Sequence, residues 1–266
     1  MTRVAVLGHV EWVEFVEVPR FPRRGEVLHA TGSFHRAAGG GGVAAAVLAE
    51  HGAEVEFFCA RGRDADGELA AEDLRAHGVT LQIAWRDAPT RRVVTLLEPG
   101  GERTILTIGE RLAPRGEDPL PWERLAACDG VYVTAGDTGA LRAARRARTL
   151  TATPRTGPAL EDAATELDAL IYSEDDPVER EPAAKLREQA RWLVATEGAA
   201  GGRYEGASAG RWEIVPAAGE PRDSYGCGDS FAAGVTLALG RGASIEEAVN
   251  TGALWGAIAL TRVGAP

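Results

Sequence analysis

The sequence predicts a three-layer α/β/α sandwich, in which a mostly parallel sheet lies between two layers of helices, together with a small β-sheet lid. Two observations predict this fold. Short apolar segments of strand character alternate with helical segments along most of the 266 residues. Two stretches, at about residues 11–35 and 90–110, break the alternation with β-type patterns. We expect one domain, residues 1–266, whose lid strands come from these two stretches.

The first half of the chain alternates strand and helix. The expected elements are the strand Val4 to Val10, the helix Gly42 to His51, the strand Val55 to Ala60 and the helix Glu68 to His77. Gly52 and Gly78 follow the two helices, and glycine is typical of the position after a helix C-terminus.

The alternation resumes after Gly130. The expected strands are Val131 to Ala135, Leu150 to Thr153, Ala169 to Ser173 and Trp192 to Thr196, and the expected helices are Gly139 to Ala147 and Ala183 to Arg191. Near the end, Ser244 and Glu247 form the capping-box pattern that opens a helix.

The segment Arg92 to Ile108 predicts a β-hairpin, because two β-type runs flank the turn Pro99 to Glu102. Ligand sites of open α/β sheets lie at the C-terminal ends of the strands. Strands that leave the sheet there are therefore expected to cover a site as a lid, rather than to be an extension without a role.

Composition excludes several classes of protein. The formal net charge is −10, which argues against nucleic-acid binding, and the cluster of Arg142, Arg145, Arg146 and Arg148 has the spacing of a solvated helix face. The sequence has no apolar run of about 18 residues that could span a membrane, and its N-terminus lacks a signal-peptide pattern. We therefore expect a cytoplasmic protein. The single lysine, Lys185, follows no glycine run, which excludes a Walker-type loop.

The segment Asp223 to Phe231 carries the clearest chemical signal. Its turn, Gly226-Cys227-Gly228, stands directly before a helical pattern. Backbone amides at a helix N-terminus are unpaired and attract anions, and glycines let an anion approach the backbone closely. Asp229 follows at the same place. It could simply cap the helix, or it could act as a general base beside a bound phosphoryl group.

These residues resemble the signature Asp-Thr-x-Gly-Ala-Gly-Asp of the ribokinase-like (PfkB) carbohydrate and nucleoside kinases, and the resemblance extends along almost the whole chain. Further segments are similar to family motifs in the same order. They are Gly39 to Gly42, Gly62 to Gly67, Gly101 to Thr104, Thr196 to Gly201 and Thr261 to Ala265.

The resemblance implies an ATP-dependent kinase that phosphorylates a hydroxyl of a small sugar- or nucleoside-like acceptor with Mg²⁺, and a monovalent cation could also bind. It implies that Asp229 is the catalytic base and that the amides of Gly226, Cys227 and Gly228 form the anion hole. The other residues that it implies are Gly39 and Gly40 for the acceptor, Thr196, Gly198, Ser173 and Asp223 on the nucleotide side, and Asp176 acting on the metal through water.

The chain departs from the family pattern mainly around the acceptor. Val43 and Ala44 occupy the neighbourhood of a usual asparagine, and Glu11 and Glu14 are the carboxylates nearest to a usual aspartate. Glu11, Glu14 and the lid residue Arg103 are therefore candidate acceptor ligands. Ser173 and Asp176 stand where the family has the Asn and Glu that organise magnesium. Cys227 replaces an alanine, and a small-residue substitution explains it better than a nucleophile does, because no histidine is paired with it.

Two alternatives stay open. The chain could be a binding or regulatory protein on a kinase fold, although a pure binder needs no base at position 229. It could also phosphorylate a non-sugar alcohol such as a hydroxymethylpyrimidine, for which Trp12 could supply aromatic stacking. A small-molecule acceptor and ATP are the expected partners, and the lid strands could pair two identical subunits edge to edge.

Overall fold

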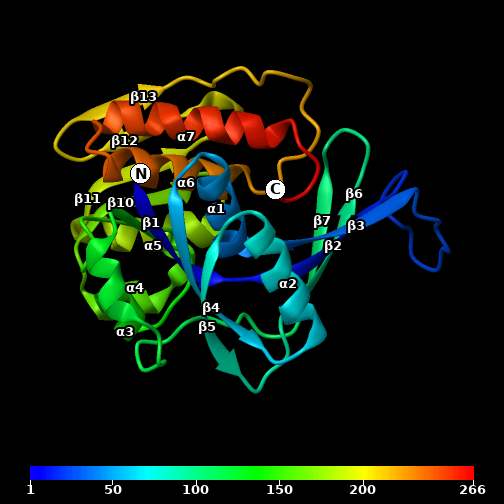
Figure 1. Ribbon diagram of the computed structural model, residues 1–266. Coiled ribbons are helices and arrows are strands. Elements are labelled where there is room, and N and C mark those ends of the chain that lie inside the picture. Colours follow the sequence, from blue (N-terminus) through cyan, green and yellow to red (C-terminus); the bar gives the residue numbers. More distant parts are fainter.

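The computed structural model describes residues 1–266 and contains a sheet of nine strands in the order β13-β12-β11-β10-β9-β8-β1-β4-β5 (Figure 1). All neighbouring strands from β11 to β5 pair in parallel, and β12 and β13 are added antiparallel at one edge. The strands are β1 (Arg3–His9), β4 (Glu54–Gly62), β5 (Thr80–Arg86), β8 (Gly130–Val133), β9 (Thr149–Ala152), β10 (Leu167–Ser173), β11 (Ala190–Thr196), β12 (Gly202–Glu205) and β13 (Ala209–Trp212).

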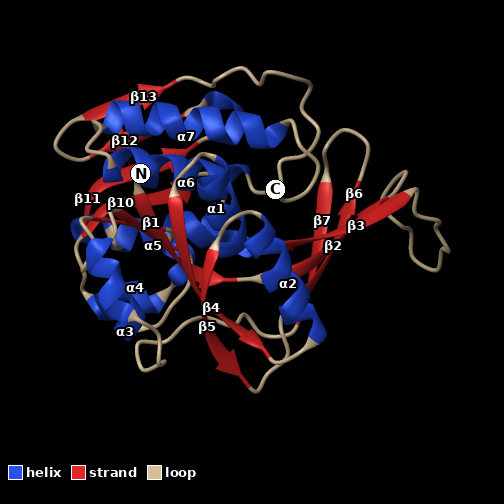
Figure 2. Cartoon of the chain, in the orientation of Figure 1, coloured by secondary structure: helices blue, strands red, loops and turns tan.

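Helices cover both faces of this sheet (Figure 2). One face carries α1 (Gly39–Glu50), α2 (Ala65–Ala76), α6 (Cys227–Gly240) and α7 (Ile245–Leu260), and the other carries α3 (Thr138–Ala144), α4 (Pro158–Ala163) and α5 (Pro177–Lys185). Side chains of β1 alternate between the two cores: Val4 and Val6 pack with α1 and α6, and Ala5 and Leu7 with α3 and α4. The three-layer sandwich is therefore confirmed.

A second sheet of four strands, in the order β3-β2-β6-β7, extends to one side of the main sheet (Figure 1). Its strands are β2 (Glu11–Glu17), β3 (Gly32–Ala38), β6 (Arg92–Leu97) and β7 (Arg103–Ile108). Along β2, Glu11, Val13 and Phe15 are buried, whereas Trp12 and Glu14 on the opposite face are partly exposed. The hairpin predicted over residues 92–108 is confirmed.

Two predicted helices are placed differently in the structure. The helix expected over residues 183–191 was wrong: α5 begins at Pro177, with Asp176 as its N-cap, and β11 already starts at Ala190. The first helix begins at Gly39 rather than Gly42, so the glycine run forms its first turn instead of preceding it. The strands β5, β12 and β13 were not predicted.

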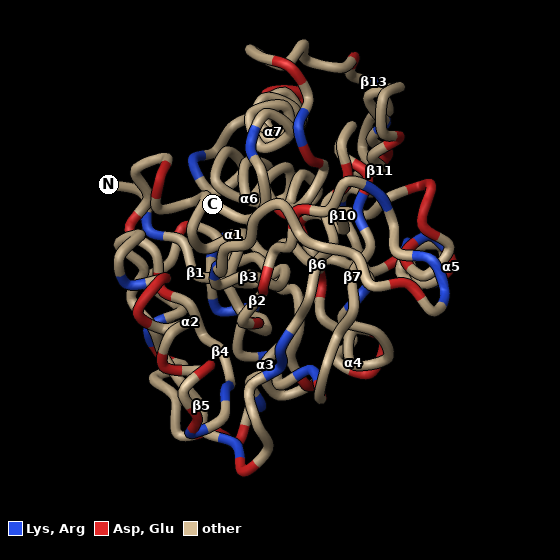
Figure 3. Tube along the Cα trace, turned by 90° about the vertical axis from the view of Figure 1, so that its right-hand side faces the viewer, with Lys and Arg blue, Asp and Glu red and all other residues tan.

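Charged residues of both signs are interspersed along the chain, and the view in Figure 3 shows acidic and basic residues mixed along the trace. Within the arginine cluster after position 140, Arg145 pairs with Asp168 and Arg148 with Asp129, both at 2.8 Å, whereas Arg142 donates to backbone carbonyl oxygens. No helix combines the length and the hydrophobicity needed to cross a bilayer.

The helices α6 and α7 pack closely because glycines face each other. A Cβ atom on Gly252 would lie 2.7 Å from the Phe231 carbonyl oxygen, and one on Gly234 would lie 2.9 Å from the Gly252 Cα. Both distances are shorter than ordinary contacts between carbon and backbone atoms. The separation of the two helices is therefore set by the absence of these side chains.

The close contact between α6 and α7 leads to a prediction about stability. We expect Gly252→Ala to lower the free energy of unfolding by about 1–3 kcal/mol, because α7 must shift to admit a methyl group. Gly256→Ala on the same helix is the control, since its Cβ would find its nearest neighbour at 3.4 Å. That control is expected to be neutral or to add up to about 1 kcal/mol of helix propensity. Urea denaturation of the two variants measures both effects, and a Gly252→Ala protein as stable as the parent would contradict the packing argument.

Candidate active site

The parallel strands end at one edge of the main sheet, and polar residues collect there. His9 ends β1, Thr134 and Arg155 follow β8 and β9, and Ser173 and Thr196 end β10 and β11. The N-termini of α1 and α6 reach the same edge, since Gly40 of α1 faces both Thr134 and Asp229. The carboxyl edge of a parallel sheet is the usual place for a ligand site.

The start of α6 presents unpaired backbone amides. Gly226 adopts a left-handed conformation with φ 71° and serves as the N-cap. The amides of Gly226, Gly228 and Asp229 donate to no acceptor within the chain, whereas the amide of Cys227 makes a long contact of 3.4 Å to the Ser224 carbonyl oxygen. A Cβ on Gly228 would meet no atom within 4 Å, so open space lies beside the backbone at this residue. This arrangement suits an oxyanion or a phosphate.

Asp229 lies in the first turn of α6, directly against α1. Its Oδ1 is 2.9 Å from the place that a Cβ on Gly40 would occupy, so a side chain at position 40 would displace the carboxyl group from its present position. Burial raises the pKa of Asp229 to about 6, and the Glu179 carboxylate adds to the shift. Arg155 and Arg111 act in the opposite direction on this pKa. A carboxyl group with such a pKa is ionised at neutral pH and remains a competent proton acceptor.

Glu11 and His9 line the site on the side of β2. Gly39, with φ 78°, approaches both: its Cβ position lies 3.0 Å from His9 Cδ2 and 3.1 Å from Glu11 Cγ. Both side chains are buried, and Glu11 pairs with Arg91 at 3.2 Å. Burial raises the pKa of Glu11 and lowers the pKa of His9, so the imidazole is neutral near pH 7.

Arg111 connects this side to the centre of the site. Its Nε donates to His9 Nδ1 at 3.1 Å, one Nη donates to the Thr134 carbonyl oxygen at 2.5 Å, and the other donates to the Arg155 carbonyl oxygen at 3.1 Å. All three acceptors are neutral. Burial lowers the pKa of Arg111, and Glu11 and Asp229 are the carboxylates close enough to raise it.

A second group of charges lies beside α5. Arg155 forms ion pairs with Asp176 and Glu179 at once. The other oxygen of Glu179 accepts the backbone N–H of Ser173 at 2.7 Å. Asp176 also caps α5 by accepting from the amide of Val178 at 2.9 Å. Ser173 thus takes part in this group of charges through its backbone amide, whereas its hydroxyl group makes no hydrogen bond.

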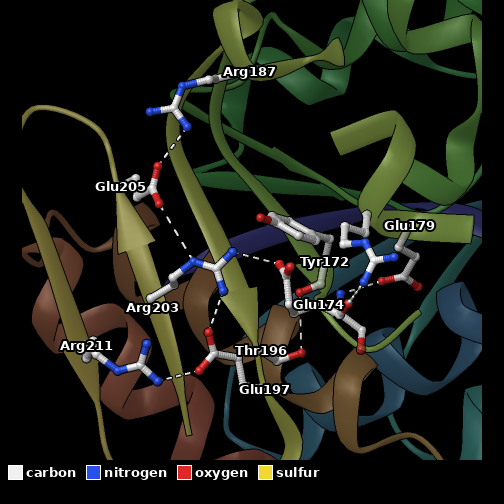
Figure 4. Close-up of polar contacts among 11 residues, drawn as sticks. Tyr172, Glu174, Glu179, Arg187, Thr196, Glu197, Arg203, Glu205 and Arg211 are labelled. Atoms are coloured by element: carbon white, nitrogen blue, oxygen red, sulfur yellow. Dashed lines mark hydrogen bonds and ion pairs between the residues drawn. The ribbon is translucent and has the colours of Figure 1, made fainter. Parts of the chain in front are cut away.

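The ends of β10 and β11 carry a network of ion pairs (Figure 4). Arg203 of β12 lies between the carboxylates of Glu174 and Glu197, which follow β10 and β11. Thr196 Oγ1 donates to the Tyr172 carbonyl oxygen at 3.3 Å, and Gly198 lies beside Asp175. The network fixes the two loops on which Thr196 and Gly198 stand.

Two further contacts hold the turn before α6. Asp223 is buried, and its two oxygens accept the amides of Tyr225 and Gly264, both at 2.9 Å. Arg103 of β7 donates to the Ser224 hydroxyl, so the small sheet contacts this turn directly. Asp223 therefore supports the loop through its backbone contacts.

Most of the residues selected from the sequence converge, and some do not. Asp229, Gly40, Gly39 and Glu11 lie together, whereas Glu14 lies on the opposite face of β2 because side chains alternate along a strand. Trp12 shares that opposite face and stacks on His35 with ring centroids 5.6 Å apart. The residues that sequence reasoning missed are Arg91, Arg111, Arg155, His9, Thr134 and Glu179. The only sequence signal for them was that several follow a predicted strand end.

Cys227 has no sign of activation. Although it is the first residue of α6, burial raises the pKa of its thiol to about 11, and Asp223 and Asp229 add to the shift. A thiol with this pKa is protonated near pH 7 and is a poor nucleophile. The helix N-terminus does not overcome these effects.

The profile of the pfkB family of carbohydrate kinases matches residues 1–157 and 160–266. The chain belongs to this family. A comparison with curated proteins finds no match.

Solved structures of pfkB-type kinases share the fold. A ribokinase from Arabidopsis thaliana, complexed with ribose and ATP, is 22% identical, with 100% of this chain and 95% of that chain covered and a TM-score of 0.79. A ribokinase from Cryptococcus neoformans var. grubii serotype A, in complex with ADP, is 26% identical over 100% and 96% of the chains, with a TM-score of 0.74. An adenosine kinase from Sinorhizobium meliloti is 20% identical over 100% and 96%, with a TM-score of 0.75.

The raised pKa of Asp229 predicts a pH-dependent stability. The folded carboxyl group has a pKa of about 6 against an ordinary value of 3.8, so folding takes up protons between these values. The free energy of unfolding should therefore fall as pH rises through this window. We expect Asp229→Asn to be more stable than the parent above pH 6, by up to about 3 kcal/mol, and to lose this advantage towards pH 4.

Thermal or urea denaturation between pH 4 and 8 measures this difference. Asp223→Asn is the matched control, because that carboxylate accepts two backbone amides and its loss should destabilise the protein by about 1–3 kcal/mol. Equal stability of Asp229→Asn and the parent across the whole range would show that the carboxyl group is not desolvated.

Proposed function

We propose that this chain transfers the γ-phosphoryl group of ATP to a hydroxyl group of a small sugar- or nucleoside-like acceptor. One observation carries the proposal: the carboxyl group of Asp229, with its raised pKa, lies in the same helical turn as unpaired amides of α6 and the open space beside Gly228. A general base next to an anion site is the pairing that phosphoryl transfer requires. The A. thaliana ribokinase of the same fold is complexed with ribose and ATP, which agrees with this assignment.

In the proposed reaction, Asp229 accepts the proton of the acceptor hydroxyl. The hydroxyl oxygen then forms a bond to the γ-phosphorus while the bond from this phosphorus to the bridging oxygen breaks, which leaves ADP. Gly39 and Gly40 bring the acceptor close to the backbone of α1, and Glu11 accepts a hydrogen bond from another acceptor hydroxyl. Positioning and charge stabilisation supply most of the catalysis in such a transfer.

The amides of Gly226, Gly228 and Asp229 are the donors proposed for the transferred phosphoryl group. This set differs from the expected one, in which the amide of Cys227 took the place of that of Asp229, because the Cys227 amide faces the Ser224 carbonyl oxygen. Thr196 and Gly198 stand on the fixed loops after β11 and are proposed to line the nucleotide. Arg103, through its contact with Ser224, is proposed to hold the small sheet over the site.

Magnesium suits the acidic side of the site. No group of three or more metal-binding side chains converges in the chain. Mg²⁺ bound with a nucleotide is held largely by phosphates and water. Asp176 and Glu179 are the partly exposed carboxylates on this side, and each has one oxygen on Arg155 and the other on a backbone amide. These two residues would hold waters of the ion, and bound Mg²⁺ would neutralise charge on the nucleotide phosphates. Asp223, in contrast, is buried and both of its oxygens accept backbone amides, so this residue offers little support for a monovalent cation.

The alternatives are affected differently by the structure. A regulatory protein on the kinase fold has no need of a desolvated carboxylate at position 229. A hydroxymethylpyrimidine-type acceptor loses the stacking expected from Trp12, which packs on His35.

Pairing of two subunits through the small sheet stays a prediction. The edge strand of this sheet, β7, exposes Ile105, Leu106 and Ile108.

Activity is tested by following ADP formation with Mg²⁺ and ATP over a panel of sugars, sugar acids, sugar phosphates and nucleosides. We expect turnover of at least one acceptor, and a loss of about 10³-fold or more in kcat for Asp229→Asn, since both the base and the negative charge are removed. Tight binding of an acceptor without turnover of any would instead support the binding protein.

Two neighbouring glycines provide a prediction for the anion site. Gly228→Ala should leave stability unchanged or slightly raised, because its Cβ enters open space at a helical position. It should weaken ADP and ATP binding by about tenfold or more, because the methyl group occupies the space before the amides. Gly226→Ala should instead destabilise the fold by about 1–3 kcal/mol, since φ is 71° and its Cβ would lie 2.9 Å from Val43 Cγ1.

Calorimetric titration of the nucleotides and urea denaturation separate these two effects. Unchanged nucleotide affinity in Gly228→Ala would place the phosphates elsewhere.

A further inference from the structure

Arg111 is a partly buried cation with no carboxylate in direct contact. Its three hydrogen bonds go to the imidazole of His9 and to two backbone carbonyl oxygens. Placing a charge away from water without an ionic partner is costly, and such groups concentrate at functional sites. A guanidinium has five N–H donors, so two of the five remain after these three bonds.

The charges of the site divide into two unequal groups. Beside β2, the two guanidinium groups of Arg91 and Arg111 stand against one carboxylate, that of Glu11. Beside α5, one guanidinium, that of Arg155, stands against the two carboxylates of Asp176 and Glu179. The second group has an excess of negative charge and suits a metal cation. Asp229 lies between the two groups, close to both Arg111 and Arg155. The first group contains Arg111, which is in direct contact with no carboxylate, on the side where the acceptor is expected.

Other donors point to the same side. His9 Nδ1 accepts from Arg111, so the neutral ring carries its proton on Nε2, which lies 3.6 Å from Glu11. The N-terminus of α1 has no side-chain cap and no acidic residue in its first turn. The Gly39 amide contacts the Tyr225 hydroxyl, whereas the amide of Gly40 donates to no acceptor within the chain, and the partial positive charge of the helix end lies beside it. Arg111, His9 and the N-terminus of α1 thus all carry hydrogen-bond donors on this side of the site.

We propose that the acceptor is an acidic polyol, a sugar acid or a sugar phosphate, and that Arg111 binds its anionic group. The proposal rests on the proposed kinase function and deepens it by naming the substrate class. The carboxylate or phosphate supplies the counter-charge that Arg111 lacks, and a guanidinium binds either group through charge-assisted hydrogen bonds. Glu11 remains available for a hydroxyl group of the same molecule because Arg91 neutralises it.

Arg111 could instead serve only Asp229, by keeping the base ionised. The two roles predict different losses. A partner of Asp229 alone affects kcat and shifts the acidic limb of the pH profile for every acceptor, whether neutral or acidic. A ligand of the acceptor's anionic group affects binding, and only for acidic acceptors.

The test is calorimetric binding of matched pairs, glucose with gluconate and ribose with ribose 5-phosphate, in saturating ADP so that the nucleotide phosphate site is filled. Inorganic phosphate is titrated as a probe of the anion alone. The parent is compared with Arg111→Gln, which removes the charge, and Arg111→Lys, which keeps it. Arg92→Gln is the control, because Arg92 of β6 is exposed and pairs with Asp66 of α2. Thermal melting and ADP affinity confirm that each variant is folded.

We expect at least one acidic member to bind tenfold or more tightly than its neutral partner, about the effect of one charge-assisted hydrogen bond. Arg111→Gln should remove this preference, Arg111→Lys should keep part of it, and Arg92→Gln should leave it intact. A preference for carboxylate or for phosphate identifies the anionic group. The proposal would be overturned if, in both pairs, the neutral compound bound as tightly as its acidic partner or more tightly. It would also be overturned if Arg111→Gln lowered the affinities for the neutral and the acidic member of a pair equally.

Failure of this inference is separable from failure of the kinase assignment. Phosphorylation of neutral acceptors with no acidic preference would leave the kinase in place and remove the role of Arg111. Acidic preference that depends on Arg111, without turnover of any acceptor, would keep the binding site and remove the kinase.

Discussion

The contact between the N-termini of α1 and α6 is the constraint on which the site depends. Gly40 leaves room for the Asp229 carboxyl group, and Gly226 leaves room for Val43 of α1. Because both helices begin at this contact, their unpaired amides and partial positive charges are directed at the same space. The carboxyl group between them is desolvated, which raises its pKa to about 6. A side chain at Gly40 would displace the Asp229 carboxyl group, and one at Gly226 would displace Val43.

The rest of the molecule holds this contact in place. The parallel sheet brings His9, Thr134, Arg155 and Ser173 to one edge, since each lies at the end of a strand. Close packing of α6 on α7 fixes the helix that carries Asp229, and Asp223 joins the preceding turn to the C-terminal segment through Gly264. The small sheet reaches the same turn through Arg103. Each of these contacts acts on position rather than on chemistry, which is how a phosphoryl-transfer site gains most of its rate.

Features set by a few neighbouring residues could be predicted from the sequence, whereas contacts between residues far apart in the chain could not. The glycine turn before Asp229 and the capping box at Ser244 are read within a few residues, and the structure has both. The helix expected over residues 183–191 was wrong because the capping signal of Asp176 before Pro177 was not recognised. Arg111 and Arg155 could not be found, because only the folded chain brings residues so far apart in sequence together. Glu14 was selected with Glu11, although alternation along a strand places them on opposite faces.

The positions of the phosphates and of the acceptor relative to Asp229 decide whether the proposed reaction is correct. A crystal structure with a non-hydrolysable ATP analogue, Mg²⁺ and an acceptor measures this directly. We expect γ-phosphate oxygens within about 3.2 Å of the amides of Gly228 and Asp229, and an acceptor hydroxyl within the same distance of the Asp229 carboxylate. A nucleotide bound with its phosphates away from α6, or a carboxyl group of Asp229 facing only solvent, would contradict the account.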